Sequence, residues 1–280
     1  MSKPFETVLL ATQGTEYDVG AERVGIELAA RFKIALRAVL PVVSNAEYEA
    51  MAPSLGQQAE AQAAGRLEAL RGEARARGVE LNGRVRSGEE PFRQIVDEAR
   101  ETRADLIVLR RRGRRGYLAK LLLGEMVHAV TGHAPCDVLI VPQDGRFWSR
   151  TVLLATDGSA HSRRAAEVAA SISAVCGLPL IVLSVAAQPD AAQDANEHVE
   201  QALALVRAAG AQATGRVVDG RPHEAIVRAA EEAGADLIVI GRRGMNALKR
   251  ALVGSTSEKV AGEARAPVLI ARTESGDTES

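Results

Sequence analysis

The sequence has few cysteines, little net charge and no long apolar run, and each absence excludes a class of protein. Its two cysteines, Cys136 and Cys176, provide neither a disulfide framework nor a metal-binding spacing. A net charge of −1 gives no overall attraction to nucleic acid or anionic lipid. No run of about 18 apolar residues predicts a membrane-spanning helix. We therefore expect a soluble, cytoplasmic protein whose two thiols are buried and reduced.

Signatures of several catalytic classes are also missing. The five histidines form no His-x-x-His or His-Glu-x-x-His pair, so we expect no metal centre. The chain contains no Gly-x-Ser-x-Gly motif of a nucleophilic serine. The first apolar run, within residues 7–12, is too short for a secretory signal and predicts a strand instead.

What the sequence does contain is a long internal repeat. Residues 7–12 and 151–156 both read TVLLAT, and residues 104–108 and 235–239 both read ADLIV. A period this long indicates two copies of a whole domain rather than a solenoid. The chain length agrees, because 280 residues suffice for two domains with a core each.

The register of the repeat defines the domain boundaries. We predict domains at residues 1–143 and 149–273, which we call the first and second copies, joined by the segment QDGRFW at 143–148. The first copy is longer in its middle, at about residues 42–60. Trp148 is expected to pack in the linker between the domains.

Both copies alternate short Val/Ile/Leu-rich runs with Ala-rich helical stretches. Continuous apolar runs indicate strands covered on both faces, hence a parallel sheet, and the alternation predicts a doubly wound, Rossmann-like α/β fold. We expect five strands and about four helices in each copy. In the second copy the expected strands are 151–156, 178–185, 211–218, 236–240 and 267–271, and the expected helices are 160–176, 194–209, 222–233 and 255–264.

Residues that follow the strands of the second copy form a candidate ligand site, since ligands of open parallel sheets bind at the carboxyl ends of the strands. Asp157 follows the first strand, and Gly241, Gly244, Gly254 and Ser255 form the pattern G-x2-G-x9-G-S after the fourth. Glycines permit close approach of the backbone, and the free amides at a helix start hold phosphate. The pattern predicts a site for a phosphorylated sugar that carries a base.

The segments TVLLATDGS, GRPHEAIV, ADLIVIGRRG, GSTSEKV and APVLIA together resemble the universal stress protein family, in its ATP-binding branch. The resemblance implies a stress-response regulator that binds ATP, with or without Mg²⁺, mainly in the second copy. It places Asp157 at the adenosine end, Val185 beside adenine, and Gly241, Gly244, Gly254 and Ser255 at the phosphates. The remaining site residues that we predict as their neighbours are Thr156, Ile240, Thr256 and Ser257.

The family also implies a mode of association. Its single-domain members dimerise through their last strands, so here residues 137–142 and 267–271 are expected to pair within one chain. Such pairing would cover two edge strands that otherwise favour aggregation. Further association into a homodimer stays open. A membrane or a nucleic acid is not expected as a partner.

Other interpretations of the second copy remain open. Residues 255–258 also read as a capping box in which Ser255 caps a helix and Glu258 reaches back, and Asp157 with Gly158 also fits a tight turn. A slow ATPase or other nucleotide-processing enzyme on the same fold, and a nucleotide-free structural adaptor, are the alternative functions.

The first copy has lost the specific residues of the pattern. Gln13 stands in place of Asp157, Arg110 in place of Gly241, and Glu125 in place of Ser255. A carboxylate where a phosphate would sit repels it and itself suits the positive end of a helix. We therefore predict a folded first copy with a degenerate nucleotide site. The basic run at 110–115 is interpreted as a solvated loop, with another phosphorylated ligand left open.

Overall fold

The computed structural model describes residues 3–45, 53–111, 124–244 and 253–273, and both copies have the predicted α/β order. The first copy contains β1 (Thr7–Ala11), α1 (Val19–Phe32), β2 (Ala35–Val43), α3 (Pro53–Ala76), β3 (Leu81–Gly88), α4 (Pro91–Thr102), β4 (Leu106–Arg110), α5 (Glu125–His133) and β5 (Asp137–Val141). The second contains β6 (Val152–Ala155), α6 (Ala160–Cys176), β7 (Leu180–Ala186), a 3₁₀ turn (Pro189–Ala191), α7 (Ala192–Ala208), β8 (Ala213–Asp219), α8 (Pro222–Glu232), β9 (Leu237–Gly241), α9 (Ser255–Glu263) and β10 (Val268–Ala271).

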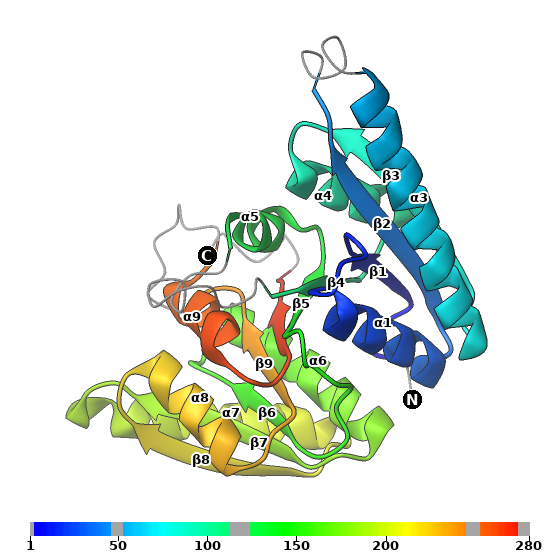
Figure 1. The fold of residues 1–280 in the computed structure, drawn as a ribbon. Helices are drawn as coiled ribbons and strands as arrows, with labels where there is room; N and C mark the ends of the chain where they lie inside the picture. Colours follow the sequence, from blue (N-terminus) through cyan, green and yellow to red (C-terminus); the bar gives the residue numbers. More distant parts are fainter. Residues whose placement is uncertain (1–2, 46–52, 112–123, 245–252, 274–280) are drawn as a thin grey trace.

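Each copy contributes five parallel strands, and the two sets join into one ten-stranded sheet (Figure 1). Its order is β3-β2-β1-β4-β5-β10-β9-β6-β7-β8. The junction is an antiparallel pair of the last strands, β5 and β10, in which Leu139 lies opposite Leu269. This confirms the predicted pairing within the chain. Because both strands are apolar on both faces, each would otherwise leave a hydrophobic edge.

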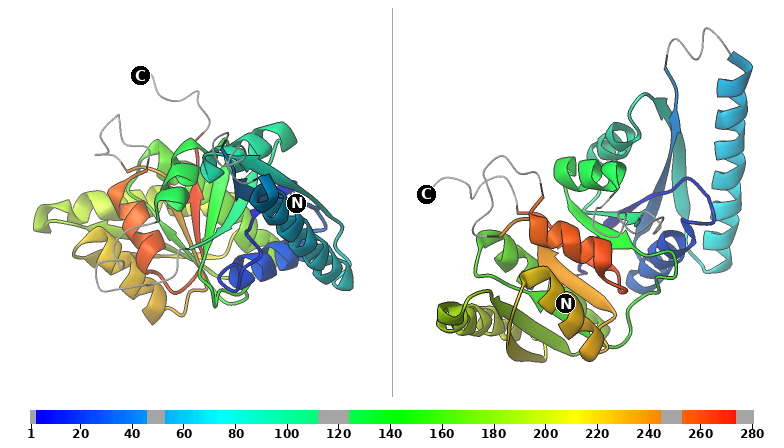
Figure 2. Two further views of the ribbon diagram at one scale, coloured as in Figure 1. Left: turned by 45° about the horizontal axis from the view of Figure 1, so that its top comes forward. Right: turned by 60° about the vertical axis from the view of Figure 1, so that its left-hand side comes forward.

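Helices cover both faces of this sheet, so two apolar layers form (Figures 1 and 2). One layer packs under α1, α3, α6 and α7, and the other under α4, α5, α8 and α9. Alternate strand residues enter opposite layers: Leu10 and Leu154 belong to the first, and Leu9 and Leu153 to the second. Both layers contain residues of both copies, so the hydrophobic core is continuous across the domain boundary.

The linker between the copies is packed into this core. Trp148 is buried, as predicted, and its ring stacks on Phe147 with the centroids 4.3 Å apart. Phe147 in turn meets Phe32 of α1 edge to face at 6.2 Å. We expected both thiols to be buried. Cys136 and Cys176 are free, but each is only partly buried.

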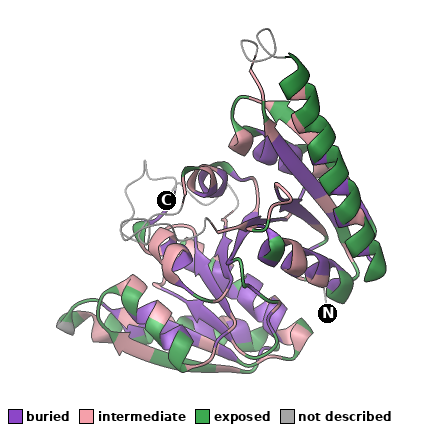
Figure 3. Cartoon of the chain, in the orientation of Figure 1, coloured by how far each residue is buried: buried purple, intermediate pink, exposed green. Residues whose placement is uncertain are grey.

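The first copy extends further from the junction than the second. Its α3 has 24 residues against 17 in α7, and the outer face of α3 is exposed (Figure 3). Part of the predicted insertion, residues 46–52, lies outside the described residues. Among the helices that the structure describes, none is long and apolar enough to cross a membrane.

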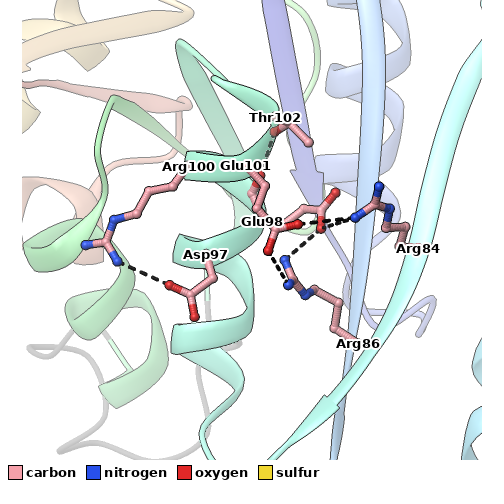
Figure 4. A network of polar contacts seen from close by, with 7 residues as sticks. All are labelled: Arg84, Arg86, Asp97, Glu98, Arg100, Glu101 and Thr102. Atoms are coloured by element: carbon pink, nitrogen blue, oxygen red, sulfur yellow. Dashed lines mark hydrogen bonds and ion pairs between the residues drawn. The ribbon is translucent and has the colours of Figure 1, made fainter.

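A network of charged side chains ties β3 to α4 in the first copy (Figure 4). Arg86 contacts Glu98 at 2.8 Å and Glu101 at 2.6 Å, and the Glu98 side chain is 3% exposed. The repeat register aligns Arg86 with Val218 and Glu98 with Ala229. At these equivalent positions, the first copy therefore has a buried ion pair and the second copy has apolar side chains.

Candidate functional site

A cavity of about 420 Å³ opens at the carboxyl ends of β6, β7 and β9 in the second copy. Strand β6 lies between β7 and β9, so the cavity is at the point where the strand order reverses. All ten site residues predicted from the sequence line this cavity: Thr156, Asp157, Val185, Ile240, Gly241, Gly244, Gly254, Ser255, Thr256 and Ser257.

One end of the cavity is formed by the start of α9. Gly254 is the N-cap and has no side chain to cap the helix, and its carbonyl accepts from the amide of Glu258 at 3.0 Å. The capping-box interpretation is therefore wrong, because Ser255 is already the first helical residue. Glu258 instead lies 3.6 Å from His128 Nδ1 of the first copy. The first amides of a helix have no partner within it, so this end of the cavity favours an anion.

Hydrogen bonds hold the two glycine segments against each other. The amide of Gly254 donates to the carbonyl of Arg242 at 2.8 Å, and Ser257 Oγ donates to the carbonyl of Gly241 at 2.7 Å. A Cβ on Gly241 would lie 2.7 Å from the His161 carbonyl carbon. The backbone of the first turn of α6 thus packs directly against Gly241. The glycine is needed there for contact with protein backbone.

Asp157 lies beside Gly244, in the loop that follows β9 and that we call the glycine loop (residues 241–244). Its Oδ1 accepts from the amide of Ser159 at 3.2 Å, and a Cβ on Gly244 would lie 2.6 Å from its Oδ2. Gly158 has φ +77°, and a Cβ there would lie 2.3 Å from the His198 ring. The turn expected at Asp157–Gly158 is therefore present, and the same turn presents the carboxylate at the cavity wall.

Three charged or titratable side chains of the cavity were missed by the sequence interpretation. Asp194 and His198 come from α7, where their spacing of four places them on one helical face, and Arg243 comes from the glycine loop. Helical periodicity could have grouped the first two, but it could not show which face of α7 points to β7. His161 is half buried and contacts Thr273 Oγ1, and it does not line the cavity.

Cations cluster beside the anion-favouring end. Burial lowers the pKa of Arg242 to about 10, with further lowering by the charges of Arg243 and Arg272. Burial and the charges of Arg242 and Arg243 likewise lower the pKa of His161. This end of the cavity is therefore electropositive, whereas Asp157 and Asp194 make other parts of the wall acidic.

In the first copy, an arginine stands at the position of Gly241. Arg110 Nη2 donates to Gln13 Oε1 at 3.0 Å, and its Nε lies 3.1 Å from Asp18 Oδ1. The guanidinium also stands 5.6 Å from the centre of the Tyr17 ring. Gly241 occupies the equivalent position in the second copy, where the backbone of the first turn of α6 lies against it and leaves no room for a side chain.

The backbone around Arg110 has changed with it. Helix α1 begins at Val19, about one helical turn later in the register than α6, which leaves room for the guanidinium. Arg66 takes the position of His198 and donates to the carbonyl of Gln13 at 2.9 Å. Glu125 is the exposed first residue of α5, where the second copy has Ser255. The rest of the basic run, 112–115, lies outside the described residues.

Comparison with known proteins agrees with this architecture. Residues 4–142 and 149–272 each match the model of the universal stress protein family. The chain belongs to this family. It is 40% identical over 136 residues to a universal stress protein of Thermus aquaticus, a match that covers 44% of this chain and 98% of that protein. A universal stress protein of Synechocystis is 29% identical over 168 residues, which cover 60% of this chain and only 58% of that relative.

Solved structures of the family include matches to the whole chain and to one domain. A universal stress protein from Archaeoglobus fulgidus covers 99% of this chain and 98% of its own, with a TM-score of 0.78 and 21% identity, and supports the fold. Another universal stress protein, solved in complex with cAMP, is 34% identical and covers 45% of this chain and 99% of its own, with a TM-score of 0.40.

Proposed function

We propose that the second domain binds ATP and that the protein acts as a nucleotide-dependent regulator in a stress response. The cavity at the ends of β6, β7 and β9 carries this proposal. Its volume of about 420 Å³ lies within the usual range for small-molecule sites. Its wall carries charges of both signs, with Arg243 near the start of α9 and the carboxylates of Asp157 and Asp194. ATP has a partner for each, with phosphates for the positive groups and hydroxyl and amino donors for the carboxylates.

Each part of the cavity has a role in this proposal. The Gly241–Gly244 and Gly254–Ser255 segments hold the phosphates, with Thr256 as a hydroxyl donor. Ser257, whose hydroxyl donates to the carbonyl of Gly241, holds the two segments together. Asp157 accepts hydrogen bonds from the nucleoside. The remaining predicted wall residues, Thr156, Val185 and Ile240, enclose the nucleoside. Any Mg²⁺ would be held mainly by phosphate and water oxygens, because the described residues hold no group of three His, Cys, Asp or Glu placed to bind a metal.

The residues of the first domain favour a single nucleotide site per chain, in the second domain. In the first domain, Arg110 donates a hydrogen bond to Gln13, and Glu125 places a carboxylate at the start of α5. A phosphate there would meet that negative charge at the helix end where the second domain has the hydroxyl of Ser255. We therefore assign nucleotide binding to the second domain alone.

Isothermal titration of the purified protein with ATP tests the proposal. The variant Ser255→Glu copies the first domain, and its carboxylate suits a helix start, so the fold should persist. A carboxylate about 4 Å from a phosphate should weaken binding by about fivefold to a thousandfold, depending on the local dielectric. The matched variant Glu125→Ser in the first domain should leave the affinity unchanged.

Three results would separate the alternatives. If the wild type does not bind ATP, the nucleotide-free adaptor is the better description. If Ser255→Glu binds as tightly as the wild type, the phosphates do not lie at the start of α9. If added ATP is turned over steadily and well above background, the protein is an enzyme rather than a regulator read by occupancy.

A further inference from the structure

Two equivalent arginines cross the domain boundary in opposite directions. Arg242, after β9, donates from Nη1 to the carbonyl of Gly132 near the end of α5, at 3.2 Å. Arg111, after β4, donates from Nη1 to the carbonyl of Ala264 at the end of α9. The repeat register aligns Arg111 with Arg242. Each cation therefore meets the negative end of the last helix of the other domain, which is a favourable placement.

Only one of these arginines is built into the proposed phosphate site. The carbonyl of Arg242 accepts from the amide of Gly254, and its own amide donates to the carbonyl of Ala271 at 2.9 Å. Its neighbours in the chain, Gly241 and Arg243, both line the cavity. The backbone of Arg242 thus joins the two glycine segments, while its side chain is anchored in the first domain.

The first domain also supplies acceptors for the cationic cluster around this residue. Arg243 and Arg272 each lie close enough to Arg242 to repel its charge. The carbonyl of Gly132 accepts from Arg242, and Asp137 Oδ1 accepts from the amide of Arg272 at 2.7 Å. Gly132 and Asp137 both belong to the first copy. The first contact fixes the Arg242 guanidinium, and the second fixes the backbone at Arg272.

We propose that the first domain is a working part of the second domain's site, with Arg242 as the positioning residue that fixes the phosphate-binding segment through Gly132. This inference rests on the proposed function. Among the residues that the structure describes, those that line the cavity come from the second copy, so the first domain acts on the ligand through such anchors. A segment held in its binding geometry before the ligand arrives loses less conformational freedom on binding. The degenerate copy is thus retained as a support.

The experiment compares Arg242→Ala with Arg111→Ala in the full chain. Both variants lose one arginine-to-carbonyl contact across the same boundary, so both should lower the melting temperature by similar amounts. Arg242→Ala should weaken ATP binding about tenfold, the scale expected for one charged hydrogen bond. Arg111→Ala should leave the affinity within about twofold. Arg242→Lys, which keeps the charge, should recover part of the loss.

The outcomes distinguish this inference from the proposed function. If the wild type binds ATP but Arg242→Ala binds equally well, Arg242 does not position the site and the inference is wrong. Equal losses of affinity in Arg242→Ala and Arg111→Ala would show a general effect of the boundary and would also overturn it. No ATP binding by the wild type would overturn the proposed function, and this inference with it.

Discussion

Removing the Arg110 side chain should destabilise the first domain, because it isolates a buried carboxylate. The Asp18 side chain is 1% exposed and lies 3.1 Å from Arg110 Nε, while the Arg110 side chain is 20% exposed. Breaking a buried ion pair from one side costs about 3–5 kcal/mol. Asp18 also accepts from the amide of Thr15 at 2.9 Å, so Arg110→Ala should fall at the lower end, near 3 kcal/mol.

Urea unfolding, followed by the fluorescence of the single tryptophan, Trp148, measures this cost. The double variant Arg110→Gly/Asp18→Ser, which takes the second copy's residues at both positions, removes the charge together with its partner and should recover most of the loss. Arg93→Ala is the control, because its ion pair with Glu90 is exposed, and it should change stability by about 1 kcal/mol or less.

Two results would refute this account of the first domain. A cost for Arg110→Ala no greater than that of Arg93→Ala would mean that Asp18 does not depend on the arginine. A double variant as unstable as the single one would mean that the loss comes from packing rather than from the isolated charge.

Two further predictions concern buried acids. Arg86→Val should lower the free energy of unfolding by about 3 kcal/mol in the same urea assay. The double variant Arg86→Val/Glu98→Ala, which has the second copy's residues, should stay within about 1 kcal/mol of the wild type. Equal losses of stability in the two variants would exclude the isolated Glu98 carboxylate as the cause. For Asp137, burial raises the pKa from 3.8 to about 6, so its contribution to stability falls as pH rises between these values. Relative to Asp137→Asn, the wild type should lose up to about 3 kcal/mol between pH 3.5 and pH 7.5, and parallel pH profiles would contradict this.

The strands and most helices could be predicted because their determinants are local. The run at 151–156 is apolar throughout, as a strand covered on both faces must be, and α6 occupies the expected residues 160–176. Ser159 caps this helix and Gly177 ends it with φ +66°. The antiparallel pairing of β5 with β10, which makes one sheet, was implied by the family resemblance, and it covers two apolar edges. Local chemistry thus determined most of the framework.

The details of the site depend on contacts that sequence patterns do not record. From the sequence, Ser255 and Gly254 are both plausible N-caps of α9. In the structure Gly254 is the N-cap and Ser255 is the first helical residue. The contact of Arg110 with Asp18 joins residues far apart in the chain. His198 enters the cavity only because α7 presents that face to β7. The comparison of the two copies identified which positions differ, but only the folded arrangement shows what Arg110 contacts in the first copy.

Native mass spectrometry of the purified protein, before and after addition of ATP, tests the central claim most directly. The uncharged start of α9 in the second domain, against the Glu125 carboxylate at the start of α5 in the first, predicts one ATP on each chain of 280 residues. Ser255→Glu should remove it, and Glu125→Ser should not. Chains that carry no nucleotide even with added ATP, or that carry two, would contradict the account.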